Sequence, residues 1–158
     1  MRHNYSAIAL GLWLGLLAGQ ARAFDLTGTW EGKVTCKRTT SSGQTTITTT
    51  ADTLTITQSA TDVRLEDARF ATPILYSGRP FAFTDDPDTG ALGFRSCGLS
   101  ENPAAAGEMG NAKVSTKPST GAGQFAATSI LSDDDGVETC KWKFTRTSAI
   151  DPGVAPCP

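Results

Sequence analysis

The residues that carry most enzyme chemistry are scarce in this chain. Its one histidine, His3, lies in an N-terminal segment that we expect to be removed, so the mature chain has none. Without histidine, Ser-His-Asp and Cys-His catalysis and the common imidazole metal sites are excluded. The chain has 16 Asp and Glu residues, but no spacing selects two of them as an acid–base pair. We therefore expect no catalytic residue, no metal, no cofactor and no enzyme.

Three short motifs are similar to ligand-binding loops but have the wrong context. Residues 121–126 (GAGQFA) are similar to a dinucleotide fingerprint, yet no apolar strand precedes them. Residues 85–90 (DDPDTG) are similar to part of an EF-hand loop, but Pro87 stands at the third ligand position and Ser96 replaces the bidentate Glu. Residues 133–136 (DDDG) are typical of a hairpin turn. A weakly held calcium ion is the alternative at the two Asp-rich turns.

The sequence contains four cysteines: Cys36, Cys97, Cys140 and Cys157. An even number of cysteines in an exported chain indicates disulfides, here two. A zinc site made of four thiolates usually shows cysteines in close pairs, and this chain has no such pair.

The first 23 residues, 1–23, have the features of a secretory signal peptide. A positively charged start is followed by apolar residues 7–19, and residues 21–23 (ARA) supply the small residues that a signal peptidase reads. This run is too short for a transmembrane helix, and no later stretch reaches the roughly 20 apolar residues of a membrane span. Cleavage before Phe24 would leave residues 24–158 as one domain with a Pro-rich tail. We expect export to the periplasm or to the extracellular medium, and the sequence leaves both open.

The charge of the mature chain is mildly acidic. Loss of Arg2 and Arg22 leaves 12 basic residues against 16 acidic residues, a net charge of −4. The basic residues are scattered along the sequence and form no stretch that would follow a phosphate backbone. We therefore do not expect nucleic acid as a partner.

Short segments rich in Thr, Val, Ile and aromatic residues alternate in hydropathy between turn residues. The expected strands are 28–38, 45–58, 63–66, 73–76, 81–83, 91–97, 112–116, 124–131 and 137–147. Turns are expected at 77–80 and 85–90, and a loop at 98–110. These nine short segments, taken as about eight strands in hairpin order, predict an all-β protein, an eight-stranded antiparallel up-and-down barrel, with a β-sandwich as the alternative.

The first and last strands match as an antiparallel pair that would close this barrel. In an antiparallel pair of strands, the numbers of two paired residues add up to a constant. A sum of 176 makes four pairs: Trp30 with Arg146, Gly32 with Phe144, Val34 with Trp142, and Cys36 with Cys140. These residues share one face, which we assign to the interior, and four lysines then face water: Lys33, Lys37, Lys141 and Lys143. Opposed residues lie within disulfide range, so we predict Cys36–Cys140, which leaves Cys97–Cys157 to hold the tail.

The chain ends also resemble a known superfamily. Residues 25–30 (DLTGTW), with Arg146 on the last strand, resemble the calycins, which include lipocalins, fatty-acid-binding proteins and avidins. This resemblance implies that Trp30 packs under Arg146 as a structural latch through a cation–π contact. It also implies a small apolar or amphipathic ligand in the lumen. Gly32 stands where avidins carry a pocket Asn, and the ligand class stays open.

Four aromatic residues are the candidate ligand-binding side chains: Tyr76, Phe81, Phe83 and Phe94. Alternatively these rings simply fill the barrel, because eight strands leave an interior just wide enough for either outcome. A second hypothesis is inhibition of an exported hydrolase. Some small periplasmic protease inhibitors resemble this plan, and residues 24–26 (FDL) would then be the segment that plugs the target.

Overall fold

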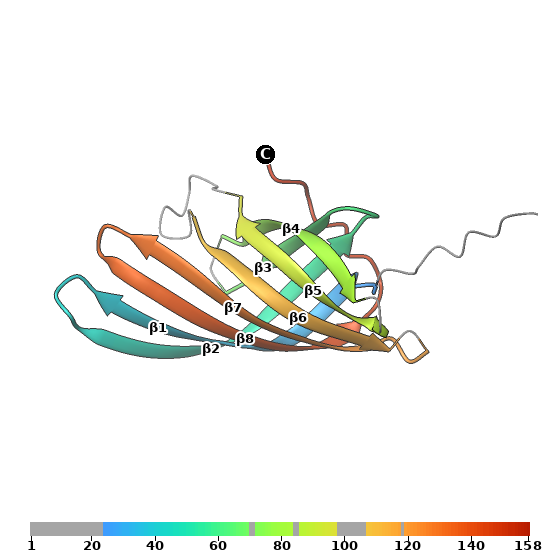
Figure 1. The fold of residues 1–158 in the computed structure, drawn as a ribbon, viewed down its shortest axis with the longest axis horizontal. Helices are drawn as coiled ribbons and strands as arrows, with labels where there is room; N and C mark the ends of the chain where they lie inside the picture. The colour runs from blue at the N-terminus through green and yellow to red at the C-terminus, as the bar shows by residue number, and fades with distance from the viewer. Residues whose placement is uncertain (1–23, 70–71, 84–85, 98–106, 118) are drawn as a thin grey trace, which may run out of the picture.

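The structure is a computed structural model that describes residues 24–69, 72–83, 86–97, 107–117 and 119–158. Each of its eight strands pairs antiparallel with its neighbours in the chain, and β1 pairs with β8, so the sheet is a closed barrel (Figure 1). The strands are β1 (Gly28–Thr40), β2 (Thr45–Gln58), β3 (Val63–Asp67), β4 (Ile74–Phe83), β5 (Asp86–Ser96), β6 (Met109–Lys117), β7 (Ala122–Asp133) and β8 (Gly136–Ser148). The predicted barrel is confirmed. The signal peptide predicted for residues 1–23 lies outside the described residues.

The seam between β1 and β8 has the predicted register. Its pairs include Trp30 with Arg146, Gly32 with Phe144, Val34 with Trp142 and Cys36 with Cys140. Alternation along each strand buries Val34 and Trp142, at 1% exposure each, and leaves the intervening lysines exposed. Gly32 is required at this seam, because a Cβ there would lie 2.7 Å from Cα of Phe144.

Both predicted disulfides are present. Cys36–Cys140 crosses the seam between directly paired residues, with a Cα–Cα distance of 4.0 Å. Cys97–Cys157 joins the residue after β5 to the C-terminal tail, with a Cα–Cα distance of 5.4 Å. The tail is also held at Thr57, whose hydroxyl donates to Asp151 at 2.6 Å and accepts from the amide of Val154 at 2.8 Å.

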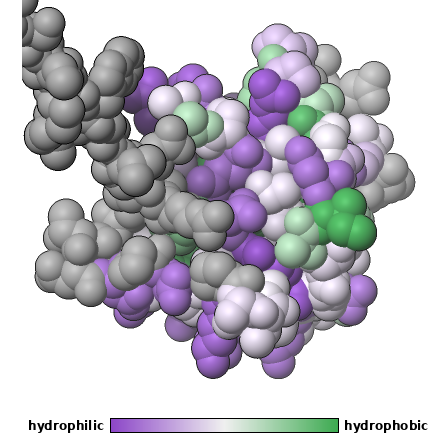
Figure 2. Space-filling model, turned by 90° about the vertical axis from the view of Figure 1, so that its right-hand side faces the viewer, coloured by the Kyte–Doolittle hydropathy of each residue, from purple (hydrophilic) through white to green (hydrophobic). Residues whose placement is uncertain are grey.

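The end of the barrel at which β1 begins, called the N-terminal end below, is closed by the chain itself. Phe24 and Leu26 are buried there, at 2% and 0% exposure. The side chain of Gln58 holds both, because it accepts from the amide of Leu26 at 2.9 Å and donates to the carbonyl of Phe24 at 3.1 Å. From this side the described surface is mostly hydrophilic (Figure 2).

The opposite end, called the hairpin end, is uneven. The β1–β2 and β7–β8 hairpins extend well beyond the other strands (Figure 1), since β3 has 5 residues and β2 has 14. Thr48 and Thr50 face inward on this extension, in register with Cys36 and Val34, yet they are exposed. The inner face of the extended hairpin is therefore partly open to solvent.

The middle of the chain differs from the prediction. The expected turn at 77–80 does not exist, because β4 runs unbroken from Ile74 to Phe83. Its last pair with β3 is Gly78 with Val63, so Pro80 lies beyond β3 and its missing N–H costs no bond to that strand. The expected turn at 85–90 is also shorter than predicted, since β5 already begins at Asp86.

One carboxylate in each of the two Asp-rich turns is engaged within the chain. Asp86 accepts from the hydroxyl of Thr89 at 2.5 Å, and Asp133 accepts two bonds from Arg38, at 2.8 and 2.9 Å. Asp133 ends β7 and pairs with Gly136, which leaves a two-residue turn as the hairpin connection. These contacts explain Asp86 and Asp133 by turn geometry.

Candidate functional site: interior cluster and outer groove

Aromatic side chains fill the interior between the two ends. Neighbouring rings meet mostly edge to face at centroid distances of 5.6–6.2 Å, through Trp30, Phe125, Phe144, Trp142, Tyr76 and Phe94 in turn. All six are at most 5% exposed. Of the predicted ligand-binding residues, Tyr76 and Phe94 are thus interior residues that contact each other and Trp142.

The other two predicted ligand-binding residues do not join them. Phe81 is 59% exposed on the outer face, so it does not line the interior as predicted. Because β4 is continuous, residues 76 and 81 differ in parity and point to opposite faces. Phe83 ends β4, and its side chain lies outside the described part of the structure.

The predicted latch is seen as a contact at the N-terminal end. The guanidinium carbon of Arg146 lies 4.8 Å from the ring centre of Trp30. The Trp30 indole N–H donates to the carbonyl of Leu26 at 3.0 Å, and Arg146 donates to the carbonyl of Asp25. Burial lowers the pKa of Arg146. The latch therefore also holds the N-terminal segment.

A second guanidinium covers a second indole at the hairpin end. The guanidinium carbon of Arg69 lies 4.6 Å from the ring centre of Trp142. Arg69 contacts Asp67 at 2.5 Å and lies 3.9 Å from Asp52 and from Glu108. Burial alone would lower the pKa of Arg69, but the hydrogen bond and charge of Asp67 outweigh it and raise the pKa. Arg69, Asp52, Asp67 and Glu108 are called the interior cluster.

Glu108 connects the interior cluster to the aromatic core. It accepts from the hydroxyl of Tyr76 at 2.7 Å and from that of Ser129 at 2.5 Å, and Ser129 accepts from the indole N–H of Trp142 at 2.8 Å. Burial first, and then the charge of Glu108, raises the pKa of Tyr76. Each polar group in this chain of bonds has a partner, which is the condition for a stable buried network.

Asp52 is the exception in the interior cluster. Its side chain is fully buried, and neither carboxyl oxygen has a hydrogen-bond partner among the described residues. Asp67 beside it offers only acceptors when ionised, so the two carboxyls can bond only through a shared proton. Burial first, and then the charge of Asp67, raises the pKa of Asp52 to about 7.

Sequence reasoning did not single out the interior cluster, although part of the signal was present. Asp52 occurs in the alternation of Asp52, Leu54 and Ile56, and Asp67 continues that of Val63 and Leu65. Alternation alone therefore places both acids on the inner face. Arg69 and Glu108 lie in connections, where no periodicity locates a side chain.

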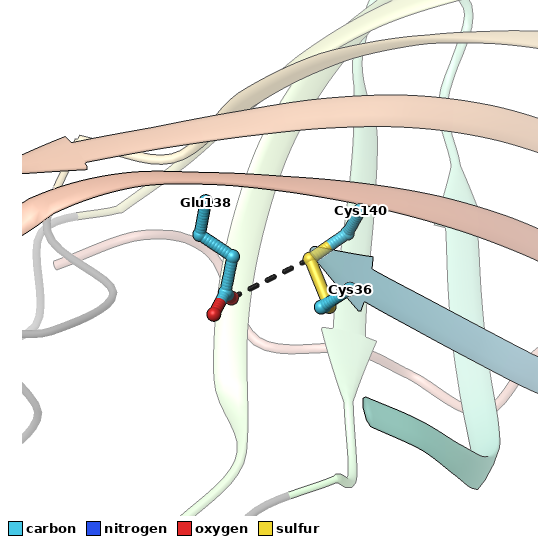
Figure 3. A group of neighbouring side chains, drawn as sticks. All are labelled: Cys36, Glu138 and Cys140. Atoms are coloured by element: carbon cyan, nitrogen blue, oxygen red, sulfur yellow. Dashed lines mark hydrogen bonds between the residues drawn. A yellow bond between two sulfur atoms is a disulfide. The ribbon is translucent and has the colours of Figure 1, made fainter. Parts of the chain in front are cut away.

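Three residues of metal-ligating type meet near the cluster, as Figure 3 shows. One ligand atom each from Cys36, Cys140 and Glu138 lie within 4.8 Å of one another. The contact of 3.5 Å between Glu138 and the sulfur of Cys140 is not a true hydrogen bond, because a bridged sulfur carries no proton. The disulfide removes the thiolates that a metal would need, and the guanidinium of Arg69 lies 3.5 Å from the sulfur of Cys36.

The outer face carries a groove across β7, β8, β1 and β2. A cavity of about 770 Å³ opens there, and its floor includes Gly32, Ala51 and Ala126, with Lys33 and Lys143 beside them. A neighbouring cavity of about 560 Å³ shares Ala126 and adds Lys113 of β6. The two cavities share Gln124 and Ala126, and together they are called the outer groove.

Exposed apolar side chains lie beside the outer groove at the hairpin end. Met109 pairs with Ile130, Ile130 with Thr139, Thr139 with Lys37, and Lys37 with Ile47, which makes one row across five strands. Met109, Ile130 and Ile47 are 63%, 50% and 69% exposed, and Val137 next to the row is 45% exposed. These four apolar residues are called the apolar row.

Comparisons of the chain with protein-family models, curated proteins and solved structures found no match. The calycin resemblance, which rests on residues 25–30 and Arg146, therefore stays a prediction. No helix among the described residues is both long and apolar enough to cross a membrane.

Proposed function

We propose that this protein is an exported, non-enzymatic binding protein that acts on another protein through the outer face of its barrel. An inhibitor of an exported hydrolase would act in this way. The filled interior supports this choice over a lumen ligand, because six aromatic rings occupy the space that a calycin ligand would need.

The apolar row is the observation that carries the proposal. Four of the exposed large apolar residues of the described chain gather on one outer face, beside charged residues. Scattered apolar residues need no explanation, but Met109 is directly paired with Ile130, and Val137 is a diagonal neighbour of Ile130. An exposed apolar group of this kind is typical of a protein interface. Such interfaces have an apolar centre and a polar rim, and the lysines beside the row would supply that rim.

A partner would meet this face rather than the N-terminal segment. Phe24 and Leu26 are buried in the chain's own barrel, and the backbone of both is held by Gln58. Residues 24–26 would have to leave this site before they could plug a target, so that form of the inhibitor hypothesis is disfavoured.

The compartment is part of the proposal. The two disulfides are consistent with an oxidising, exported environment. Residues 1–23 would then be the signal peptide, and the partner would be met in the periplasm or in the medium.

The proposal is tested with a panel of exported proteases and glycosidases from the source organism. We expect the protein to inhibit at least one of them, and Ile130→Asp to weaken this inhibition about tenfold or more, because it buries a charge in the interface. Ile150→Asp is the matched control, since Ile150 is 79% exposed away from the apolar row. Absence of inhibition across the panel, or equal inhibition by Ile130→Asp, would contradict the proposal.

A small ligand is a second candidate function, favoured by Asp52. A buried carboxylate without a donor partner is costly, and an ammonium group could replace the proton that it needs. The ligand would be an amphipathic amine that enters at the hairpin end, beside the exposed Thr48 and Thr50. Because the carboxyl is fully buried, Arg69 would have to shift to admit it.

Hexylamine and hexanol distinguish this candidate in calorimetric titrations. Hexylamine should bind more tightly at pH 8 than at pH 5.5, since protons compete for Asp52 below its pKa of about 7. Asp52→Asn should abolish this difference, whereas Asp62→Asn, at an exposed acid, should not. Equal binding of hexanol and hexylamine would exclude the candidate.

A further inference from the structure

The fold gathers all the lysines of the chain on one side. The sequence has six, and each is exposed on the outer face of β1, β6 or β8: Lys33, Lys37, Lys113, Lys117, Lys141 and Lys143. The four predicted to face water do so. They are not scattered in space, however, because closure of the barrel places β1 beside β8 and leaves only β7 between β8 and β6.

Register concentrates these charges further. Lys33 and Lys143 are directly paired across the seam. Lys141 pairs with Thr35 and Lys37 with Thr139, so those two lysines are diagonal neighbours one step further along the seam. Like charges directly opposite each other are destabilising in a sheet. The repulsion between Lys33 and Lys143 is explained if a bound anion compensates their charges.

The lysines form no close ion pairs among the described residues. No ion pair joins any of the six to a described Asp or Glu, since the four described ion pairs all involve arginine. Of the residues that line the outer groove, Glu31 and Asp86 are acidic. Hydrogen bonds from Thr89 and from the amide of Asp88, and the charge of Lys113, lower the pKa of Asp86, so this carboxylate keeps its charge. Three lysines (Lys33, Lys113 and Lys143) against these two acidic residues leave the outer groove with a small net positive charge, although the mature chain is acidic.

We propose that the outer groove binds an extended, acidic segment of the partner polypeptide, with Lys33 and Lys143 at its centre. This inference deepens the proposed function, because it names the chemistry of the partner. From Lys33 to Lys37 the seam extends about 13 Å, the length of roughly four extended residues. Carboxylates of such a segment would meet the lysines, and its apolar residues would reach the apolar row.

A polypeptide fits the outer groove better than other polyanions. The lysines offer point charges, and no arginine lines the two cavities to grip phosphate with two bonds. Phe125 and Phe144 line the groove but are 1% and 4% exposed, so they offer no platform for stacked bases. The hollow shape does not suit a flat bilayer, and the adjacent apolar row favours a partner that combines carboxylates with apolar side chains.

Fluorescence anisotropy with a labelled octapeptide of alternating Glu and Leu tests the inference. The wild-type protein should bind it, and affinity should fall roughly tenfold when salt rises from about 20 to about 200 mM. The double variant Lys33→Gln/Lys143→Gln should bind at least about tenfold more weakly and with less salt dependence. Lys117→Gln is the matched control, since Lys117 lies on the same face but lines neither cavity. A peptide of alternating Gln and Leu should not bind.

Thermal melting separates loss of binding from loss of folding. The double variant should melt at the same temperature as the wild type or higher, because it removes a like-charge pair. Equal affinity of the double variant, or equal affinity of the Gln–Leu peptide, overturns the inference. Tighter binding of polyphosphate or of vesicles of anionic lipid overturns the choice of a polypeptide. A salt-sensitive dimer in light scattering would assign the groove to a second copy and overturn it likewise.

The hydrolase assay distinguishes this inference from the proposed function. If Ile130→Asp weakens inhibition but the double lysine variant does not, the outer groove is not the site and the proposed function stands. If the acidic peptide binds but no hydrolase is inhibited, the groove assignment stands and the inhibitor role fails.

Discussion

Asp52 determines the charge of the interior cluster. Three carboxyl groups there face one guanidinium, and Asp52 is the carboxyl whose oxygens have no described donor. A proton on Asp52 removes a buried charge, and it lets Asp52 donate a hydrogen bond to the carboxylate of Asp67. The native protein therefore retains this proton up to a pH near 7.

This retention predicts a pH-dependent contribution to stability. The pKa of Asp52 is about 7 in the native state against an ordinary value of 3.8. The native state thus binds more protons than the unfolded state between these values, and its free energy of unfolding falls as pH rises from about 4 to 7. At pH 8, Asp52→Asn should be more stable than the wild type by on the order of 1–2 kcal/mol, because its amide needs no proton.

Urea unfolding at pH 5 and pH 8 checks this expectation. The difference between Asp52→Asn and the wild type should grow from the lower pH to the higher pH. Asp62→Asn, which changes an exposed acid, should follow the wild type. If Asp52→Asn is less stable than the wild type at pH 8, the ionised carboxylate of Asp52 stabilises the native state and the expectation is wrong.

Among the elements, β1 and β8 are the pair that closes the sheet. The two predicted properties of this pair, its register and its disulfide, come from the same pattern of alternation. A one-residue slip would turn Cys36 and Trp142 outward and the lysines inward. Burial of one face therefore fixes the register without any information from the rest of the chain.

The two disulfides should contribute unequally to stability. The double variant Cys36→Ala/Cys140→Ala removes a disulfide that joins two core strands 104 residues apart in the sequence. Its free energy of unfolding should fall by about 4–5 kcal/mol in the chain-entropy model. Cys97→Ala/Cys157→Ala should cost clearly less, because the native tail regains freedom when it is released. Urea unfolding of both double variants gives the comparison, and a larger loss for the second pair would contradict it.

Sequence reasoning was less successful where strands do not alternate clearly. Gly78 and Pro80 are typical of a turn, and the prediction of a turn at 77–80 also led to the wrong face for Phe81. Tertiary context overrides these signals, because Gly78 gives room for the side chain of Leu92 and Pro80 lies where β3 has ended. A single missed strand boundary therefore reversed the predicted orientation of a candidate site residue.

In the whole molecule, closure decides which distant residues meet. Guanidinium and indole groups cover each other at both ends, Arg146 with Trp30 and Arg69 with Trp142. The first pair could be expected from the chain ends, whereas Arg69 follows β3 and meets β8 only across the barrel. The lysines gather by the same closure, although they are dispersed in the sequence.

The sequence by itself determined the all-β class, the register of the closing seam and the disulfide across it, because period-two alternation and a constant residue sum need only the two strands concerned. The second disulfide then followed by elimination. The tertiary structure alone decided that aromatic rings fill the lumen, that an unpaired Asp52 lies inside, and that the lysines share a groove. Each of these depends on how side chains from several strands pack together in the closed barrel. No one-dimensional pattern carries such distances until the barrel has closed.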